Sequence, residues 1–353
     1  MMRHVSAFFN EPNALDVFAY RGFLFVLTFN GRILQYDVAE LARQMQSEAE
    51  ESGLAIAYGL FSSKGIGAWP EMKTAWQSFH LSEQRLKITP IPMARSRFVI
   101  EASAHLDMRV FYNQMFLATD TGTIRIPLGP RGTLPEDRED IELLVDKPTE
   151  SLSTGLGAVG ASLGDEGLAV FTNVGSKGKS SLIRLDIRSL RSSIGWGNTV
   201  NHPTHDSYEV LPSEVAESKS GRRTLVGVRA PAEVATDSET LDEDSYAVWE
   251  SGRLLVGNMS GVDSHGRFTG RRRSLTYSSD GSPLLWLGAT GNRCIVTETP
   301  TRVEVMRGEE STVLFEGPTA SIRTFPSSQR YRRLIASTVE GGFLLSAAFP
   351  TPA

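Results

Sequence analysis

Residues 23–36 of the chain read FLFVLTFNGRILQY, two apolar runs joined by Asn30-Gly31. This dipeptide between hydrophobic runs is a strong signal for a β-hairpin with a two-residue turn, because both turn residues must accept positive φ. The same plan of strand, turn and strand recurs in MFLATDTGTIRIPL (115–128), LAVFTNV with SLIRLDI (168–174 and 181–187), YAVWESGRLLVG (246–257), RCIVTETPTRVEVM (293–306) and LIASTVEGGFLLS (334–346). A unit repeated in this way predicts one repetitive all-β domain.

Apolar segments flank each hairpin and complete a unit of four strands. The expected inner strands are residues 15–20, 106–112, 156–163, 224–229, 283–290 and 322–325, and the clearest outer strands are 141–145, 208–211 and 312–316. The last hairpin has no outer strand after it, whereas the opening strand, residues 3–9, has no hairpin of its own. We therefore expect a β-propeller whose N-terminal strand completes the last blade, since propellers leave no long sheet edge unpaired.

The six hairpins predict six blades in a single domain covering residues 1–353. The spacing between hairpin turns is uneven, so we expect insertions at about 38–100, 191–222 and 231–245. Seven blades remain the alternative, with one degenerate blade hidden between residues 53 and 100.

One inserted helix is expected near residues 38–52. Val38, Leu41, Ala42, Met45 and Ala49 fall on one helical face. Asp37 with Glu40 fits a capping box at the start, and Gly53 is placed to end the helix. The helix either packs along the flank of the propeller or serves as a docking helix for a partner.

A dense group of aromatic residues follows this helix. Trp69, Trp76 and Phe79 lie in a segment, residues 64–80, that does not fit the blade pattern. They either anchor a loop on the core or form an interface hot spot, where Trp is enriched. We take them as candidate partner-binding residues.

Clustered arginines are the second candidate for partner binding. Arg271, Arg272 and Arg273 are consecutive, and further arginines cluster at 222–223 and at 330, 332 and 333. If blades bring such residues to one face, they form a surface for phosphate or an acidic protein; otherwise they are separate solvated charges. The acidic segment within 231–245, DSETLDEDS, is expected to be a solvated loop, with an acidic partner-binding segment as the alternative.

Catalytic and metal-binding motifs are missing from the sequence. No HExxH, paired CxxC, GxSxG or Walker loop is found, and GSKGKS at 175–180 lacks the Walker spacing. His202, His205 and Asp206 have metal-compatible spacing but no second cluster accompanies them, so a solvated loop is favoured. We accordingly expect no catalytic, cofactor-binding or metal-binding residues and no cofactor.

Composition bears on compartment and partners. The single cysteine, Cys294, excludes an internal disulfide, and its apolar surroundings favour a buried residue over a nucleophile. No apolar run approaches the roughly 20 residues that span a bilayer, and Glu11 and Pro12 interrupt the N-terminal run, so we expect no signal peptide. The net charge of −5 argues against nucleic acid as the main partner. These features predict a cytoplasmic protein with protein partners and no membrane association.

At the level of architecture, the repeated hairpins resemble WD40-like and quinoprotein-like propellers, although no Trp-Asp dipeptide ends the blades. The resemblance and the missing catalytic cluster favour a non-enzymatic interaction or scaffold protein, a subunit or regulator in a bacterial multi-protein system. A propeller hydrolase or lyase with an axial site is one alternative, with candidate residues at the hairpin turns: Asn30, Asp120, Asn173, Glu250 and Glu340. A small-ligand sensor is the other alternative.

Overall fold

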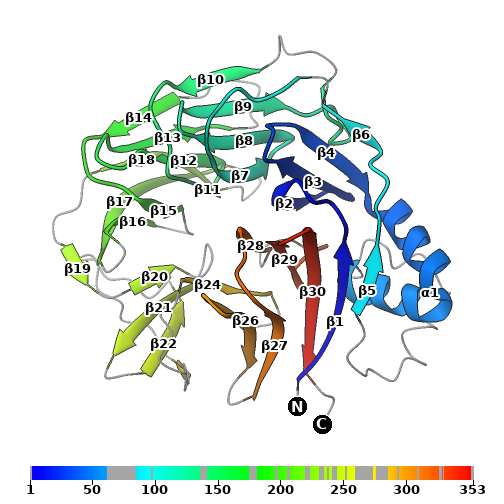
Figure 1. The fold of residues 1–353 in the computed structure, drawn as a ribbon. Coiled ribbons are helices and arrows are strands. Elements are labelled where there is room, and N and C mark those ends of the chain that lie inside the picture. Colours follow the sequence, from blue (N-terminus) through cyan, green and yellow to red (C-terminus); the bar gives the residue numbers. More distant parts are fainter. Residues whose placement is uncertain are drawn as a thin grey trace. The chain divides into compact units, whose positions relative to one another are not determined.

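The computed structural model describes residues 2–61, 85–96, 98–135, 141–174, 181–194, 198–204, 207–218, 223–229, 234–236, 238–240, 245–250, 253–258, 273–275, 285–291, 294–307, 310–325, 328 and 330–350. Two compact units are distinguished. Unit 1 comprises Met1–Ile100, Arg131–Glu136 and Ser278–Ala353, and unit 2 comprises Glu101–Pro130 and Asp137–Tyr277. In the described part of the chain, each unit consists of antiparallel β-sheets, and unit 1 adds a helix (Figure 1).

Three sheets belong to unit 1. The first contains β2 (Ala14–Tyr20), β3 (Phe23–Thr28), β4 (Ile33–Asp37) and β6 (Ala94–Arg95), in that order. The second contains β24 (Trp286–Ala289), β25 (Ile295–Thr299), β26 (Arg302–Arg307) and β27 (Glu310–Glu316). The third has the order β28 (Ser321–Thr324), β29 (Leu334–Val339), β30 (Gly342–Pro350), β1 (Met2–Phe9) and β5 (Arg85–Ile88).

Four sheets belong to unit 2. They are β7 (His105–Phe111), β8 (Gln114–Thr119), β9 (Thr123–Pro127) and β10 (Glu142–Val145); β11 (Ser151–Gly155), β12 (Ala158–Ser162), β13 (Leu168–Thr172) and β14 (Ser181–Leu185); β15 (Arg191–Ile194), β16 (Asn198–Thr204), β17 (Ser207–Glu217) and β18 (Arg223–Val228); and β20 (Ser238–Thr240), β21 (Ser245–Glu250), β22 (Arg253–Asn258) and β23 (Arg273–Leu275). The short strand β19 (Val234–Thr236) pairs with β17.

All six predicted hairpins are pairs of adjacent antiparallel strands, namely β3–β4, β8–β9, β13–β14, β21–β22, β25–β26 and β29–β30. The described strands form seven sheets, one more than the number of predicted hairpins, and the additional sheet does not lie between residues 53 and 100, where the seven-bladed alternative placed a degenerate blade. The sheet without a predicted hairpin is β15 to β18, formed largely by residues 191–222, for which we expected an insertion. In the preceding sheet, β13–β14 are the third and fourth strands, whereas the other five hairpins are the second and third.

The turn after β3 differs from the two-residue turn that Asn30-Gly31 predicts. Thr28 and Arg32 pair across a three-residue loop, with Thr28 N donating to Arg32 O at 2.9 Å, and only Gly31 has a positive φ, of 73°. A three-residue hairpin loop with its last residue in the left-handed region is the common alternative to the two-residue turn. Thr28 Oγ1 stabilises this loop by donating to Arg32 O at 2.8 Å.

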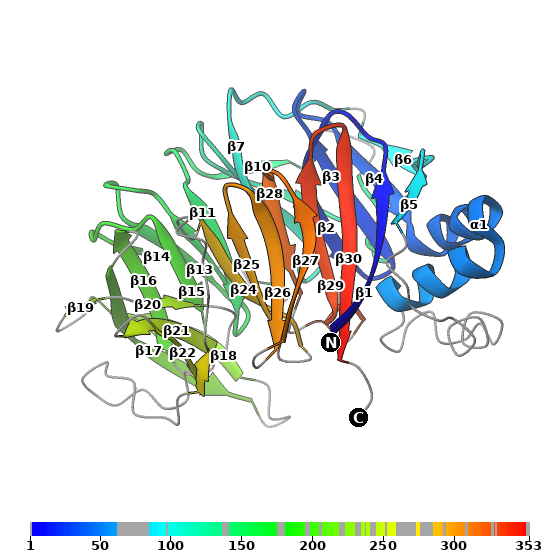
Figure 2. The same ribbon diagram turned by 60° about the horizontal axis from the view of Figure 1, so that its bottom comes forward.

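The predicted closure by the first strand is confirmed. β1 pairs with β30 in an unbroken antiparallel register from Met2↔Pro350 to Phe9↔Phe343, and Figure 2 shows the two strands side by side. β5 adds to the other edge of β1 in parallel. The C-terminal sheet is therefore completed by the N-terminal strand, as the unmatched strand at each end of the sequence predicts.

The inserted helix, α1 (Val38–Phe61), begins as predicted. Asp37 Oδ1 accepts hydrogen bonds from Ala39 N at 2.8 Å and Glu40 N at 3.0 Å, which satisfies free N–H groups of the first turn. The Glu40 side chain, however, pairs with Arg43 instead of completing a capping box.

The predicted end of the helix at Gly53 is wrong. The helical path is interrupted at Ala49 and Glu50, the latter with φ of 47°, and a second helical segment then runs to Phe61. A Cβ at Gly53 would lie 1.8 Å from Met45 O. Gly53 therefore allows the two helical segments to approach closely, and it does not provide the left-handed residue that ends many helices.

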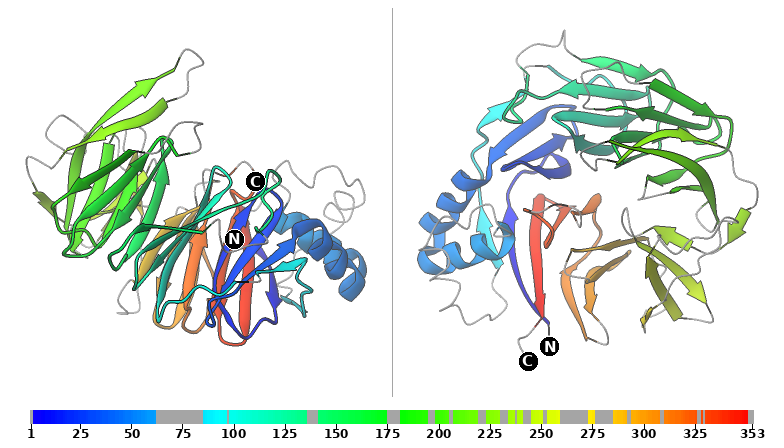
Figure 3. Two further views of the ribbon diagram at one scale, coloured as in Figure 1. Left: turned by 90° about the horizontal axis from the view of Figure 1, so that it is seen from above. Right: turned by 180° about the vertical axis from the view of Figure 1, so that it is seen from behind.

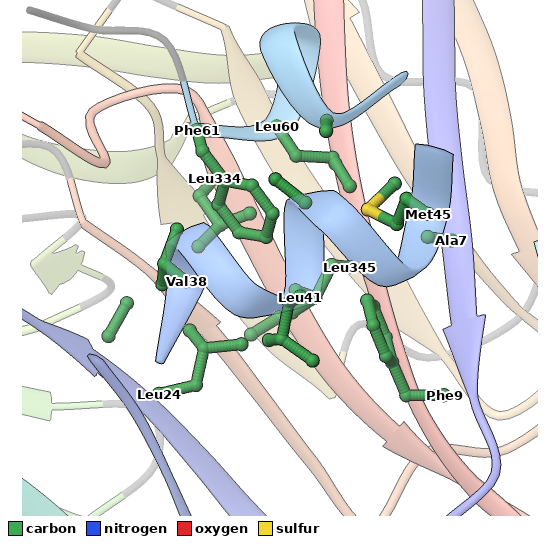
Figure 4. Close-up of a cluster of buried hydrophobic side chains, with 14 of the residues drawn as sticks. Ala7, Phe9, Leu24, Val38, Leu41, Met45, Leu60, Phe61, Leu334 and Leu345 are labelled. Carbon is green, nitrogen blue, oxygen red and sulfur yellow. The ribbon is translucent and has the colours of Figure 1, made fainter. Parts of the chain in front are cut away.

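The largest apolar cluster of unit 1 lies between this helix and the strands that it covers. Helix α1 lies beside β1 and β5 (Figure 3), and it contacts β1, β4, β5 and β30. Figure 4 shows Leu41 and Met45 facing Phe9 and Leu345, all four fully buried. Phe9 also stacks on Phe343 with ring centroids 4.9 Å apart. The helix was expected either to pack along the flank of the propeller or to dock a partner. Its buried apolar face packs against the strands of unit 1, as the first alternative predicts.

A buried polar network joins β2 to β28 within unit 1. Arg323 Nε donates to Asp16 Oδ1 at 2.7 Å, and the Arg323 Nη2 group pairs with Asp16 Oδ2. Ser321 Oγ donates to Asp16 Oδ1 at 3.0 Å, and Thr338 Oγ1 is 3.0 Å from Ser321 Oγ. The Asp16 and Arg323 side chains are 6% and 8% exposed, so this ion pair is largely shielded from water.

Candidate functional site

Most of the partner-binding residues predicted from the sequence lie outside the described part of the chain. This applies to Trp69, Trp76, Phe79, Arg271 and Arg272. Arg273 is the first residue of β23, where its backbone pairs with Val256.

Of the turn residues proposed for an axial active site, Asn30 bonds within its own turn and Asp120 bonds to a residue that precedes β7. Asn30 Oδ1 accepts the Thr28 hydroxyl at 2.6 Å. The Asp120 carboxylate accepts the Ser103 hydroxyl, and this bond is the first cause of its lowered pKa. The other three lie at strand ends: Asn173 directly after β13, Glu250 as the last residue of β21, and Glu340 between β29 and β30.

His105, beside Asp120, is the described residue nearest in character to an acid–base group. Burial lowers its pKa, and the Asp120 charge opposes that shift. Neither ring nitrogen has a hydrogen-bond partner among the described residues, and the Ser103 hydroxyl is bonded to Asp120. The arrangement therefore lacks the nucleophile-to-base hydrogen bond that a Ser-His-Asp triad requires.

The metal site considered from the sequence is not assembled by the described residues. His202 is buried in β16, while His205 and Asp206 lie outside the description. No group of three or more His, Cys, Asp or Glu side chains in the described part of the chain could hold a metal ion. Cys294 is buried in the core of unit 1, in keeping with the predicted small apolar residue.

One sequence candidate remains on an ordered part of unit 1: the arginines at positions 330, 332 and 333. They lie between β28 and β29, and we call residues 330–333 the arginine loop. Its one uncharged residue, Tyr331, is 1% exposed, and its ring lies 6.3 Å from that of Phe325. The Tyr331 hydroxyl accepts a hydrogen bond from Gly22 N at 2.8 Å, which ties the loop to the turn between β2 and β3.

Backbone contacts fix the remainder of the arginine loop. Ser328 Oγ accepts hydrogen bonds from Tyr331 N at 3.0 Å and Arg330 N at 3.3 Å. Gly291 N donates to Arg332 O at 2.6 Å, and Leu334 N donates to Tyr331 O at 2.8 Å. The positions from which the three arginine side chains extend are therefore set by the fold.

Arg330 is held against the neighbouring turn. A Cβ at Gly22 would lie 2.5 Å from Arg330 Nη1, which shows how closely the guanidinium approaches this turn, and the φ of 96° at Gly22 favours glycine there. Arg330 also hydrogen-bonds to the Tyr331 hydroxyl. Burial raises the pKa of Tyr331 to about 12, and the nearby Arg330 charge partly opposes this. Tyr331 is therefore a neutral anchor at ordinary pH.

Arg333 is half-buried, and its guanidinium lies 5.4 Å from the centroid of the Phe349 ring. Burial lowers its pKa, and the adjacent Arg332 charge adds to this effect. The weaker influences of Tyr58 and Cys294 act in the opposite direction. Arg333 Nε is buried without a hydrogen-bond partner among the described residues. Its environment thus penalises the positive charge without a described carboxylate to compensate it.

Arg332 is exposed, and only its backbone is anchored. Within the described residues, no ion pair joins Arg332 or Arg333 to a carboxylate of the chain. A guanidinium presents planar N–H donors that match carboxylate and phosphate oxygens. The loop is therefore suited to contact an anionic group.

The residues that build this site were only partly visible in the sequence. The three arginines were visible as a cluster, but their anchors Tyr331, Ser328 and Gly22 were not singled out. The sequence signal for such an anchor is an aromatic residue inside a charged run, because a Tyr ring between arginines is stabilised when it is buried and its hydroxyl is hydrogen-bonded.

The comparisons with known proteins bear on the fold. No family model matches the sequence, and no curated protein matches it either. Among solved structures, the chain has the fold of β-propeller domains of the WD40 class, an all-β propeller with one inserted helix. It is similar to the WD40 beta-propeller domain of Doa1, with a TM-score of 0.51 and 10% identity, over 97% of this chain and 94% of that one. It is also similar to the beta-propeller domain of Cps50 (Swd1) from Myceliophteria thermophila, with a TM-score of 0.54 and 8% identity, over 96% of both chains.

Among the described helices, none is both long and apolar enough to cross a bilayer.

Proposed function

We propose that this protein is a non-enzymatic interaction propeller, a cytoplasmic subunit or regulator in a bacterial multi-protein system that binds protein partners through its loops. The proposal rests on the arginine loop. Its backbone is fixed by hydrogen bonds, and the side chains of Arg332 and Arg333 are not used in ion pairs with described carboxylates. An ordered loop with uncommitted binding groups is what a recognition surface requires, because little conformational freedom is lost on binding.

The polar side chains at the described turns support binding over catalysis. Asn30 bonds within its own turn, Asp120 accepts the Ser103 hydroxyl, and His105 has no hydrogen bond to a nucleophile among the described residues. The two similar solved structures are propeller domains that share only 10% and 8% sequence identity with this chain. Identity this low does not transfer a role, so these structures support only the fold on which the proposal depends. A hydrolase or lyase and a small-ligand sensor have no specific observation in their favour.

The test is to express the full chain with an affinity tag in its source cells and to purify it after mild crosslinking. Size-exclusion chromatography with light scattering, followed by mass spectrometry, gives the stoichiometry of any complex. We expect a partner at a fixed molar ratio that remains bound through a second purification step without crosslinker. A chain that purifies alone and turns over a panel of ester, glycoside and phosphoester substrates would refute the proposal.

A further inference from the structure

We propose that the arginine loop, residues 330–333, docks an acidic segment of a protein partner, with the carboxylates of Glu or Asp side chains paired to Arg332 and Arg333. This inference rests on the proposed function and names the chemistry of the partner. Four observations carry it: charge, environment, rigidity and the sign of the whole chain.

Charge concentration is the first. Three of the four residues in the loop are arginines, and the charge of Arg332 contributes to the lowered pKa of the adjacent Arg333. Like charges held together repel each other, and a carboxylate placed between them relieves that repulsion. The loop therefore has more to gain from an anion than three separate surface arginines would.

The environment of Arg333 is the second. Its guanidinium is half-buried against Phe349, and its Nε lies without a partner among the described residues. A partly desolvated cation forms stronger contacts with an anion than an exposed one, because water screens the pair less.

Rigidity is the third. The loop backbone is fixed through Ser328, through the Tyr331 anchor and through the bond from Gly291 N to Arg332 O. A ligand that binds here orders two side chains but no backbone, which lowers the entropic cost of association. An extended peptide with alternating side chains suits such a short, fixed row of cations.

The sign of the whole chain selects a protein carboxylate over a large polyanion. The chain has a formal net charge of −5, which disfavours a nucleic acid or an anionic membrane, because such a large polyanion interacts with much of the protein at once. A short acidic segment meets only the local field, because charges farther away than the Debye length of about 8 Å are screened at physiological salt. The local positive charge therefore decides the contact.

The test measures binding of a short fluorescein-labelled peptide of alternating glutamate and glycine to the full chain by fluorescence anisotropy. The variant is Arg332→Glu, because this side chain is exposed and its substitution removes no described contact of the core. The matched control is Arg95→Glu, an equally drastic change at an exposed arginine in β6 of the same unit. Arg332→Lys tests whether charge alone suffices.

We expect Arg332→Glu to weaken binding at least about tenfold, Arg95→Glu to change it less than about twofold, and added salt to weaken it for the unaltered chain. Arg332→Lys should retain part of the affinity, because the charge remains while the planar fork is lost. Equal losses for Arg332→Glu and Arg95→Glu, or no peptide binding at low salt, would overturn the proposal.

Two competitors separate the other sources of negative charge. Vesicles containing anionic lipid and a single-stranded oligonucleotide are added to the preformed peptide complex. We expect neither to displace the peptide at matched charge concentration, and displacement by either would overturn the choice of a protein carboxylate. A stoichiometric partner that stays bound to the Arg332→Glu chain would refute this docking surface while leaving the proposed function intact.

Discussion

The buried pair between Asp16 and Arg323 makes a sharp prediction about stability. Asp16 belongs to β2 and Arg323 to β28, so the pair joins the first sheet of unit 1 to the last. We consider Asp16→Ala, Arg323→Met and the double variant. Each single change leaves a charged group in a site where the two side chains are 6% and 8% exposed.

The expected magnitude follows from what each variant leaves behind. Asp16→Ala removes the acceptor of two Arg323 donors and of the Ser321 hydroxyl, and it leaves a buried cation. Breaking a buried pair from one side costs about 3–5 kcal/mol. The double variant leaves neither charge unpaired, so it should cost clearly less than the sum of the singles, with a coupling of about 2 kcal/mol or more.

The assay is urea denaturation followed by circular dichroism and, independently, by intrinsic fluorescence, because agreement of the two probes tests for two-state behaviour. Since about 4 kcal/mol is a large part of the usual stability of a domain, the isosteric Asp16→Asn is included as a milder change. Single variants that each lose less than about 1 kcal/mol, or a double variant whose loss equals the sum, would refute the role assigned to this pair.

Three further outcomes are expected. Gly53→Ala should lower the melting temperature by several degrees, since its Cβ would lie 1.8 Å from Met45 O; an unchanged thermal melt would contradict the close helix contact. Thr119→Val should cost about 1–2 kcal/mol in a urea titration, because the Thr119 hydroxyl donates to Gly122 O at 2.8 Å and is fully buried. His105→Gln should flatten the pH dependence of unfolding: burial lowers the folded pKa of His105, so the unfolded chain binds its proton first and stability falls as pH drops below the ordinary value of 6.5. Identical pH profiles for the two proteins would show that His105 does not contribute.

The architecture could be predicted from the sequence because hairpins are local. Each hairpin needs only two apolar runs and a turn, so all six appear as paired strands. The unmatched strand at residues 3–9 could also be assigned to the last sheet, because a sheet edge at one end of the sequence and a spare strand at the other satisfy each other.

The sheet β15–β18 could not be assembled from the sequence because β15 and β16 lack the apolar pattern, although residues 208–211, within β17, and 224–229, which overlap β18, were expected to form strands of other blades. β15 reads RSSI and β16 reads NTVNHPT, so polar residues fill most positions. Their buried side chains include Ser192 and Asn201. Ser192 Oγ lies 3.0 Å from Ser153 Oγ, in β11 of the adjacent sheet. The packing between these strands therefore involves small polar groups that pair only after folding. Hydrophobic periodicity does not reveal such pairs in the sequence.

Only part of the arginine loop could be predicted from the sequence, because the contacts that hold its backbone form only when the chain folds. A run of arginines is readable in any sequence, but whether they gather or scatter depends on what holds the backbone. Here the anchor is the contact between Tyr331 and Gly22, which are separated by 309 positions along the chain. The break at Glu50 in helix α1 was likewise hidden, since Gly53 carried the more familiar signal for a helix end.

The pairing of β1 with β30 sets an order of events during synthesis. β1 leaves the ribosome well before β30, its antiparallel partner, which ends at Pro350. At about 5–20 residues per second, translation of the intervening chain takes roughly 20–70 s. During that interval β5 can already pair with one edge of β1, whereas the edge that later pairs with β30 has no partner from its final sheet. The nascent chain therefore carries one unpaired edge of this strand until the last strand is made.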